Sequence, residues 1–581
     1  MLRRREFIVG AAGALPFSRV LAVPAEPPAM RLGVMTDTHV GKTVQSCQLV
    51  RKALELFKAK GAEMIINNGD IADWFYPTGY QAYRQVSEEV YGADYRPQEI
   101  FTYAWHDAYN YKDYAREEVS KAAPFAFEEV RQLLKAPNGH TAEVKFKGYT
   151  FLVMPQFTGC KGFLTLAEYD AKVAAACEAN PGKPVFVVDH VPPRGTVYHS
   201  YVWGNPYTRK VLNKYPQVVD FSGHVHGSLR NDLFIWQKEF TVINSGCLQV
   251  WGGVLANNPA GRKSKRSYGV LTVDVYSDRL LVRRWDVRDG SEIDPDHPWV
   301  VPLPFAAETA PYERSRRAAS APKPLFPAGA AMSAVPEGSP FKGFKITFPE
   351  VAENVMLYRI GAQKRGADGN WATFAWLEEF SEYWKHPKDR TGKVEFMFGA
   401  DYFEPGVEYR FFATPQNQYG GRGNSIFAEA KSPAEFVKAE VVYENDDPMK
   451  DLEFHWRLDK PPMKAVDGFY GPTKENWHWL KLPKGLFTGP ENTKYRVTLD
   501  IHTIQPDEGM PYEVGVSDPA VAPGTGGRVL TPFGDSAENR YVIPLVKKQP
   551  EVDTYYVSLL RGFDGRVKFG RVKVERVEAG S

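Results

Sequence analysis

Short apolar runs that end in polar residues recur along about the first 250 positions. Helices are predicted between these runs. Ser46–Lys60 has apolar residues at helical spacing and is followed by Gly61. Thr165 and Glu168 have the spacing of a capping box at the start of a second helix, which extends to Asn180. The runs themselves have the length of buried strands and cover Met30–Met35, Glu63–Asn67, Ile100–Trp105, Pro184–Val188 and Pro216–Phe221. Alternating runs continue to about residue 305. Strands mixed with helices predict an α/β domain of two packed sheets.

The rest of the chain alternates as β structure does. Residues 306–342 are rich in Ala, Pro and Ser with little periodicity, which predicts a linker or wrapping segment. Alternating runs over residues 343–435 and again over 439–581 predict two all-β sandwich domains.

Composition supports several ordinary globular domains. The chain has 581 residues, 43% hydrophobic and 24% charged, and a single core rarely grows beyond about 250–300 residues. A net charge of +2 gives no electrostatic basis for binding nucleic acid or an anionic membrane. The four cysteines have no metal-type spacing, so we expect buried free thiols at Cys47, Cys160, Cys177 and Cys247.

The N-terminus has the features of an export signal. Three arginines at positions 3–5 precede the apolar run Ile8–Phe17, which is shorter than the roughly 20 residues that span a bilayer. Arg4-Arg5-Glu6-Phe7 resembles the twin-arginine signal, which implies a signal peptide over residues 1–25 and a bacterial periplasmic location. The alternative is a basic tail with no targeting role. No later segment is predicted to span a membrane.

Carboxylates and imidazoles gather where the apolar runs end. Five of the twelve histidines belong to these clusters. The clusters are Asp37-Thr-His39, Gly69-Asp70-Ile-Ala-Asp73, His106-Asp107, Asp189-His190-Val-Pro-Pro193 and Gly223-His224-Val-His226. Such side chains, converging from several strand ends, suit a pair of divalent metal ions.

In this order and spacing the clusters resemble the calcineurin-like metallophosphoesterase superfamily. The resemblance covers about residues 30–250 and implies that residues 30–305 form a four-layer α-β-β-α sandwich whose strand-end loops hold two metal ions. It implies that one ion is held by Asp37, His39, Asp70 and His226. Asp70 then bridges to a second ion, which His190 and His224 complete. Oxygen and nitrogen ligands suit Mn, Fe or Zn.

The resemblance also assigns the remaining roles. His106 is the general acid for the leaving oxygen or a clamp on the phosphate, and Asp107 holds the His106 ring in its useful tautomer. Asp73 orients its neighbours. The implied reaction is hydrolysis of a phosphomonoester or small phosphodiester through a hydroxide bound by two metal ions. Substrate choice is expected to depend on Trp74–Pro97 and Arg194–Tyr207.

One position departs from the family pattern. The third motif of the family is Gly-Asn-His-Asp, whereas this chain has Ala104-Trp105-His106-Asp107. A tryptophan side chain has only an N–H donor and cannot ligate a cation, so the second ion has one ligand fewer. Solvent or Asn110 fills the vacant position, or the second ion is weakly held.

Two alternatives remain open, and Trp105 favours the first of them. One is a catalytically weakened phosphatase-like scaffold that carries a carbohydrate-binding module. The other is a nucleotide or cyclic-nucleotide phosphodiesterase, since near-neutral charge argues against polynucleotides but not against small diesters.

The two C-terminal domains carry weaker signals. Phe403-Glu-Pro-Gly-Val-Glu-Tyr409, with Asn417-Gln-Tyr-Gly420, resembles the tyrosine-corner end of a fibronectin type III domain. The last domain resembles a jelly-roll sandwich of the type that binds sugars. Its aromatic residues either form a stacking platform for sugar rings or fill the sandwich core or domain interface. They are Trp456, Phe469, Tyr470, Trp477 and Trp479.

Overall fold

The computed structural model describes residues 26–41, 44–72, 77–92, 95–107, 127–154, 163–248, 268–351, 353–435, 439–455, 460–471, 477–504, 513–517, 528–530, 537–547, 552, 554–560 and 566–577. The predicted signal peptide lies outside these residues, as do Asp73, Asn110, Cys160 and Trp456. No helix of the described part is both long and apolar enough to cross a membrane.

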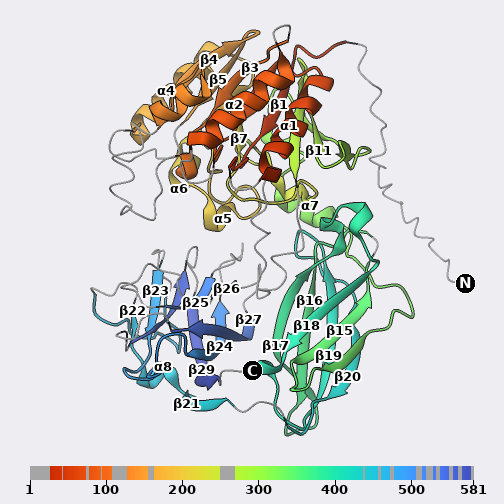
Figure 1. Ribbon diagram of the computed structural model, residues 1–581, viewed down its shortest axis with the longest axis vertical. Coiled ribbons are helices and arrows are strands. Elements are labelled where there is room, and N and C mark those ends of the chain that lie inside the picture. The colour runs from red at the N-terminus through yellow and green to blue at the C-terminus, as the bar shows by residue number, and fades with distance from the viewer. Residues whose placement is uncertain are drawn as a thin grey trace, which may run out of the picture.

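Two sheets form the centre of the first domain (Figure 1). The first sheet has the order β12-β11-β10-β1-β2-β3, with β13 paired to β11, and the second has the order β4-β5-β6-β7-β9-β8. The strands of the first sheet are β1 (Met30–Met35), β2 (Met64–Asn67), β3 (Gln98–Phe101), β10 (Gly269–Val275), β11 (Arg279–Asp286), β12 (Ser291–Ile293) and β13 (Trp299–Pro302). Those of the second are β4 (Ala142–Phe146), β5 (Tyr149–Val153), β6 (Val185–Val188), β7 (Val218–Ser222), β8 (Ile235–Gln237) and β9 (Thr241–Asn244).

Helices cover the outer faces of both sheets. One apolar cluster lies between the two sheets, a second joins the first sheet to α1 (Val44–Ala59) and α2 (Pro77–Tyr91), and a third joins the second sheet to α4 (Leu166–Ala179) and α6 (Pro206–Leu212). This arrangement is the predicted α-β-β-α sandwich. The capping box is also present, since the Thr165 hydroxyl accepts from the Glu168 amide at 3.2 Å and the Glu168 carboxylate accepts from the Thr165 amide at 2.8 Å.

The strand predicted over Ile100–Trp105 ends early. β3 stops at Phe101, and Trp105–Asp107 form a short 3₁₀ turn, η1. The Thr102 amide still donates to the Asn67 carbonyl of β2 at 2.9 Å, while its hydroxyl donates to the Val188 carbonyl of the second sheet at 3.2 Å. The two sheets approach each other at this point.

The second domain is an all-β sandwich whose sheets have the orders β14-β15-β18 and β17-β16-β19-β20. The Tyr409 hydroxyl accepts a hydrogen bond from the Glu404 amide at 2.8 Å, which is the predicted tyrosine corner. The strands are β14 (Ser333–Glu337), β15 (Gly343–Pro349), β16 (Leu357–Arg365), β17 (Trp371–Phe380), β18 (Lys393–Gly399), β19 (Glu408–Gln416) and β20 (Ile426–Lys431).

The segment predicted as a linker is built into the fold. It contains the 3₁₀ turn η5 (Ala307–Thr309) and helix α7 (Arg314–Ser320). Its end contributes β14 to the first sheet of the second domain, and Phe326 and Phe341 pack in the core of that domain. The second domain therefore begins before residue 343, because apolar side chains spaced irregularly along residues 306–342 are buried by contacts distant in the sequence.

The third domain is a second β-sandwich, with a sheet of order β21-β29-β24-β27 against one of order β22-β23-β28-β25-β26. Its strands are β21 (Glu440–Asn445), β22 (Phe454–His455), β23 (Trp477–Lys481), β24 (Lys494–Ile504), β25 (Glu513–Ser517), β26 (Arg528–Leu530), β27 (Ala537–Val546), β28 (Tyr556–Leu560) and β29 (Arg566–Val577). Helix α8 spans Pro448–Asp451. Tyr470 and Trp479 are 3% and 6% exposed. For these two residues the structure favours packing over a sugar-stacking platform, and Phe469 is half-buried beside His502 and Arg566.

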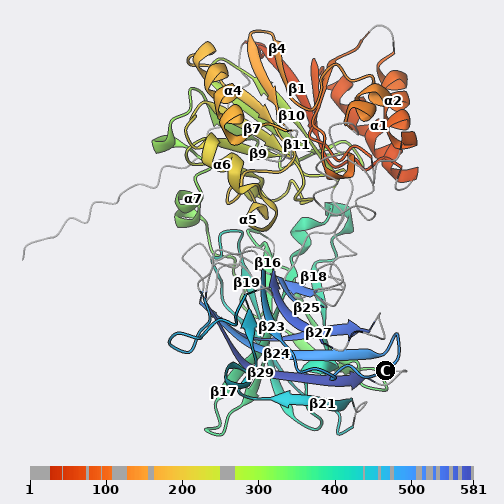
Figure 2. The ribbon, with the colours of Figure 1, turned by 90° about the vertical axis from the view of Figure 1, so that its left-hand side faces the viewer.

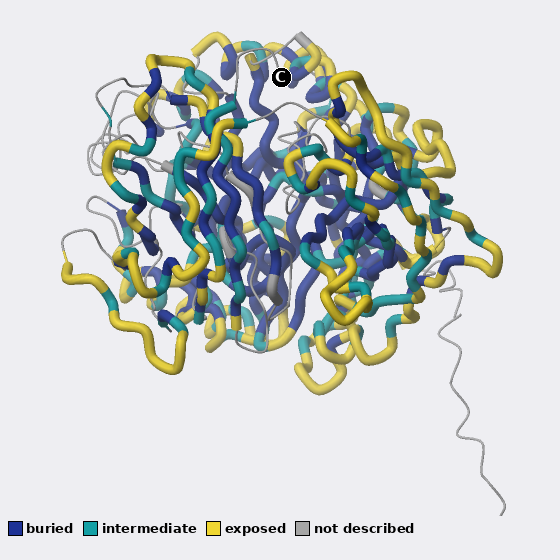
Figure 3. The backbone as a smooth tube through the Cα atoms, turned by 90° about the horizontal axis from the view of Figure 1, so that it is seen from below, coloured by how far each residue is buried: buried dark blue, intermediate teal, exposed yellow. Residues whose placement is uncertain are grey.

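The two sandwich domains lie side by side on one side of the first domain (Figures 1 and 2). His386 of the second domain contacts Asp289 of the first at 3.0 Å, and Arg288 contacts Asp389 at 3.1 Å. The Asn539 side chain of the third domain exchanges two 3.1 Å hydrogen bonds with the backbone of Trp376 in the second. Seen from the side of the sandwich domains, the buried residues lie inside and the exposed turns outside (Figure 3).

Candidate metal centre

The predicted ligands converge where the two sheets of the first domain face each other. Asp37 follows β1, Asp70 follows β2, His190 follows β6, and His224 and His226 follow β7. The carboxyl ends of parallel neighbours lie at one edge of a sheet, so the pairings of β1 with β2 and of β6 with β7 bring these loops together.

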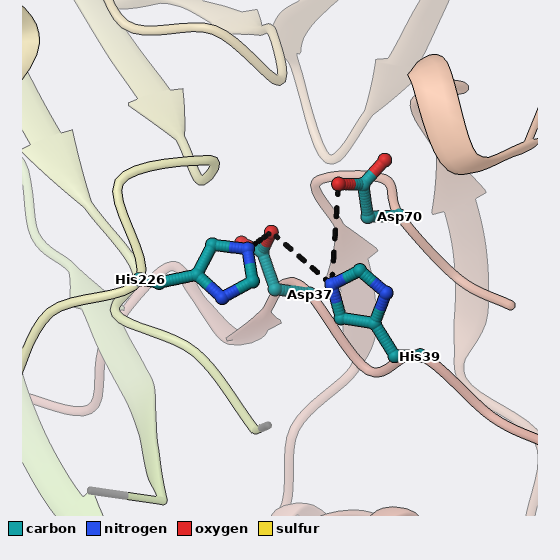
Figure 4. Close-up of side chains that lie close together, drawn as sticks. All are labelled: Asp37, His39, Asp70 and His226. Atoms are coloured by element: carbon teal, nitrogen blue, oxygen red, sulfur yellow. Dashed lines mark ion pairs between the residues drawn. The ribbon is translucent and has the colours of Figure 1, made fainter. Parts of the chain in front are cut away.

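Four of these residues form a first group, shown in Figure 4. One ligand atom from each of Asp37, His39, Asp70 and His226 lies within 4.8 Å of the others. The Nε2 atom of His226 is 2.8 Å from Asp37 Oδ1, and that of His39 is 3.9 Å from Asp37 Oδ1 and 4.0 Å from Asp70 Oδ2. Two carboxylates and two imidazoles around one point suit a divalent ion, so the residues fit the predicted metal.

A second group shares one carboxylate with the first. It consists of Asp70, His190 and His224, and the Nε2 atom of His190 is 3.3 Å from Asp70 Oδ2. The other oxygen of Asp70, Oδ1, accepts from the amide of His106 at 3.1 Å. The Oδ2 atom is therefore the one that faces both groups, which suits a bridging ligand.

Hydrogen bonds select the ligand atom on two other side chains. Asp37 Oδ2 accepts from the Thr36 hydroxyl at 2.7 Å and from the His224 amide at 2.9 Å, which leaves Oδ1 toward the metal group. The Nδ1 atom of His190 is 2.7 Å from the Asn68 carbonyl, so Nδ1 carries the proton and Nε2 faces Asp70. Thr36 and Asn68 were not predicted to take part in the site. Their only sequence signal is their position next to a ligand motif.

The backbone at the ligands is strained. Five of the six candidate ligands have positive φ, from 40° at His39 to 69° at His224. Non-glycine residues in this region cost on the order of 1–3 kcal/mol each and persist only where surrounding structure enforces them. Gly223 shows the enforcement, because a Cβ atom there would lie 1.9 Å from Thr36 Oγ1 and 2.8 Å from Asp37 Oδ2.

His106 stands beside the shared carboxylate. Its Nε2 atom is 4.0 Å from Asp70 Oδ2, and its ring meets the His39 ring edge-on with centroids 4.7 Å apart. The side chain is 18% exposed, so the imidazole borders both the two metal groups and solvent. An imidazole at this position can exchange a proton with solvent or with a molecule bound beside Asp70.

Asp107 has other partners than the predicted one. Its Oδ1 atom accepts from the amides of Ile71 and Ala72 at 2.9 and 3.3 Å and from the Tyr80 hydroxyl at 3.0 Å, and Oδ2 accepts from the Ala104 amide at 3.1 Å. Asp107 thus ties the loop after Asp70 to η1 instead of orienting the His106 ring. Spacing alone places the two residues together but does not say which way the carboxylate points.

Trp105 packs against apolar side chains and does not serve as a metal ligand. Its half-buried side chain lies against the apolar cluster between the first sheet and its helices. The second group has three members, Asp70, His190 and His224, and Asn110, the predicted substitute ligand, lies outside the described residues.

The segment predicted to govern substrate choice divides into two parts. Tyr198, His199 and Tyr201 are 6%, 4% and 4% exposed, so they support the structure. Trp203, at the end of α5 (Ser200–Trp203), is half-buried, and its ring lies 6.0 Å from that of His224. Trp203 is therefore the aromatic side chain of this segment that borders the second group. Of the other predicted segment, Trp74–Pro97, residues 77–91 form α2.

Charge and burial set the protonation of the groups. Burial raises the pKa of Asp70, but the neighbouring His190 and His106 outweigh it and hold this pKa well below its usual range. Burial lowers the pKa of His190, but the charge of Asp70 and the hydrogen bond to it raise the net pKa to about 10. Burial and the neighbouring His190 lower the pKa of His224 to about 3. His190 therefore carries a proton at neutral pH in the metal-free protein, and His224 does not.

The sandwich and this cluster define a candidate metal centre between two sheets. Residues 30–228 match the family model of the calcineurin-like phosphoesterases. This part of the chain is a calcineurin-like phosphoesterase domain, as its motifs predicted.

Comparisons over the whole chain add little. No curated protein matches it. A structure of promiscuous carbohydrate-binding modules from the β-sandwich superfamily has 14% identity and a TM-score of 0.14, over 43% of this chain and 99% of that one. The tandem CBM22 domains of Paenibacillus barcinonensis Xyn10C have 8% identity and a TM-score of 0.18, over 44% and 92%. The chicken CNTN1 FN1–FN3 domains have 12% identity and a TM-score of 0.14, over 53% and 80%. Similarity this low carries no argument about fold or ligand.

The protonation of His190 predicts coupling between metal binding and pH. Its Nε2 proton faces Asp70 and has to leave before Nε2 can ligate an ion. Below the raised pKa of about 10, binding at the second group should therefore release about one proton per ion. The apparent affinity should fall by about tenfold for each unit that the pH is lowered, which follows from one bound proton.

Isothermal titration at pH 7 in two buffers of different ionisation enthalpy measures the released protons. His190→Gln removes both the titrating group and one of the three ligands, so the second binding step and the proton release that accompanies it should disappear together. Equal heats in both buffers for the unaltered protein would contradict the prediction.

Proposed function

We propose that the protein is an exported, metal-dependent phosphoesterase that hydrolyses a phosphomonoester or a small phosphodiester with two divalent ions. The observation that carries the proposal is the shared carboxylate of Asp70, which belongs to both groups of candidate ligands and whose Oδ2 atom faces His39 of the first and His190 of the second. A catalytic pair needs such a bridge, whereas two unrelated structural ions do not.

The residues divide the work of hydrolysis. Two divalent ions at these groups would polarise the phosphate oxygens and lower the pKa of a bound water to near neutrality. Asp37, Asp70 and the imidazoles hold their ligand atoms in place before any ion arrives, because backbone and hydrogen bonds fix them. His106, at the solvent side of Asp70, delivers a proton to the leaving oxygen or contacts the phosphate.

The ligand atoms indicate a class of metal ions and not one particular metal. The groups offer carboxylate oxygens and imidazole nitrogens and no sulfur, which suits Mn, Fe or Zn. The substrate is a small molecule, since a net charge of +2 provides no field for a polyanion.

The second candidate is a catalytically weakened scaffold that carries a carbohydrate-binding module. Trp105 favours it, because the indole stands where the family has a metal-ligating asparagine. Burial of Tyr470 and Trp479 weighs against it, because those rings are not available to a sugar. Metal content and turnover separate the two candidates.

Removing the bridge tests the enzyme. Asp70→Asn keeps the side-chain volume but removes the negative charge that both ions share, so turnover should fall by at least a thousandfold and the metal content should drop. The measurement is a panel of phosphomonoesters and phosphodiesters assayed with Mn, Fe and Zn, together with elemental analysis.

Asp278→Asn is the matched control, because Asp278 lies in the turn between β10 and β11 with its side chain 65% exposed. It should retain full activity. Unchanged turnover in Asp70→Asn, with an intact circular dichroism spectrum, would refute the two-ion enzyme.

Trp105 predicts unequal metal affinities. If the second group lacks a fourth ligand, its ion should be lost on dialysis and restored by excess Mn or Zn, while the first group keeps its ion. Trp105→Asn should tighten the second site by about 10–100-fold, by analogy with the effect of single groups around a metal. Two ions that both survive dialysis in the unaltered protein would argue against this reading.

Export is proposed from the N-terminal residues alone. Arg4→Lys combined with Arg5→Lys preserves charge but removes the twin-arginine pair, so the full-length protein should stay unprocessed in the cytoplasm. Cell fractionation with an immunoblot measures this. Normal appearance of the shortened chain in the periplasm would mean that another route exports the protein.

A further inference from the structure

The chain that follows the two histidine ligands is held in one packing arrangement. Leu229 is fully buried, and a Cβ atom on Gly246 or Gly269 would lie 2.8 or 2.6 Å from its side chain. A Cβ atom on Gly227 would lie 2.0 Å from the Phe234 ring. The segment from His226 to Phe234 therefore has little room to shift. Because it is packed in this way, a displacement near Phe234 is expected to change the position of His226.

That far end carries Asp232, in the 3₁₀ turn η3 (Asp232–Phe234). Its Oδ1 atom accepts from Arg284 at 2.9 Å and from Trp299 at 3.1 Å. Its Oδ2 atom and its carbonyl accept from Arg317 at 3.0 and 2.9 Å. Burial raises the pKa of Asp232, but the two arginines outweigh it and lower the pKa, so the carboxylate stays ionised between them.

Arg284 links this carboxylate back toward the metal centre. Its side chain is fully buried and also donates to the Leu229 carbonyl at 3.2 Å, three residues beyond His226. Further bonds to Asp294 and to the His297 carbonyl, at 3.3 and 2.9 Å, fix the guanidinium in place. Charge-assisted bonds of this kind are stronger and more directional than neutral ones.

Arg317 lies on α7, outside the sheets of the first domain. Its guanidinium is 5.3 Å from the rings of both Tyr312 and Tyr419, and Tyr419 belongs to the second domain. The Asn417 side chain of that domain donates to the Pro322 carbonyl just after α7, at 3.0 Å. The second domain, α7 and the histidine loop thus form one continuous series of polar contacts.

We propose that Arg317 is a positioning residue for the ligand His226, so that docking of the second domain sets the metal affinity of the first group. This inference rests on the proposed function only in requiring that the group of Asp37, His39, Asp70 and His226 binds a divalent ion. Arg317 acts through Asp232, Arg284 and Leu229 and touches neither ion nor substrate.

The test replaces Arg317 by methionine in the full-length protein. Arg317→Met keeps the length and the apolar stem but removes the charge and both bonds to Asp232. The dissociation constant for Mn or Zn at the first group should rise several-fold, less than the roughly 10–100-fold that follows the loss of a group bonded directly to a metal ligand, because Arg317 acts through intervening residues. Competition with a chromogenic chelator measures it directly, without turnover.

Arg316→Met is the matched control on the same helix. Among the described residues, the Arg316 guanidinium donates within the connecting segment, to the carbonyls of Ala310 and Glu308 at 2.6 and 2.8 Å, so its loss should change the affinity by less than twofold. Arg317→Lys retains the charge but not the paired bonds, and should give an intermediate affinity.

Thermal unfolding, measured on the same samples, separates positioning from general support. An Arg317→Met protein that melts earlier but binds metal as tightly as the unaltered protein would overturn the inference and leave the proposed function intact. An unaltered protein that binds no divalent ion would overturn both. A variant that fails to fold is replaced by Arg317→Lys, for which the same affinity comparison decides.

Discussion

The metal centre depends on the hydrogen bonds that join the two sheets through Asn68. This residue lies between β2 and Asp70, and its side chain donates to the carbonyls of Asp189 and Phe221, at 2.9 and 2.7 Å, at the ends of β6 and β7. Its own carbonyl meets His190. Asn68 thus fixes the ends of β6 and β7, which carry the imidazoles, relative to the end of β2. Asp70 can belong to both ligand groups only while the spacing between these strand ends is kept.

This geometry requires unfavourable backbone conformations at several ligands. Positive φ at Asp37, His39 and Asp70 would be unfavourable in an isolated loop. Backbone contacts between the two loops, such as those from the amides of Asp37 and His39 to the carbonyls of Gly69 and Asp70, both at 3.0 Å, hold the strained residues in place. The ligands are therefore preorganised, and little rearrangement is left for the moment of binding.

Features that depend on residues close together in the sequence could be predicted from the sequence. Ligand motifs at strand ends, the Thr165 capping box and the corner at Tyr409 all have short-range signatures, and each is found in the structure. Contacts between distant segments have no such signature. The orientation of Asp107 toward Ile71, the end of β3 at Phe101 and the burial of Phe326 and Phe341 arise from tertiary contacts, which periodicity does not record.

The apolar cluster between the two sheets of the first domain contains three side chains of the second domain: Met356 just before β16, Leu357 in β16 and Phe380 in β17. The core of the phosphoesterase domain is thus completed by side chains contributed from beyond its own boundary. Cooperative folding follows from shared burial, because neither part can expose this cluster without cost to the other. A chain of three architectural domains should accordingly melt with fewer than three transitions, and evolution could not exchange the second domain without redesigning the interior of the first.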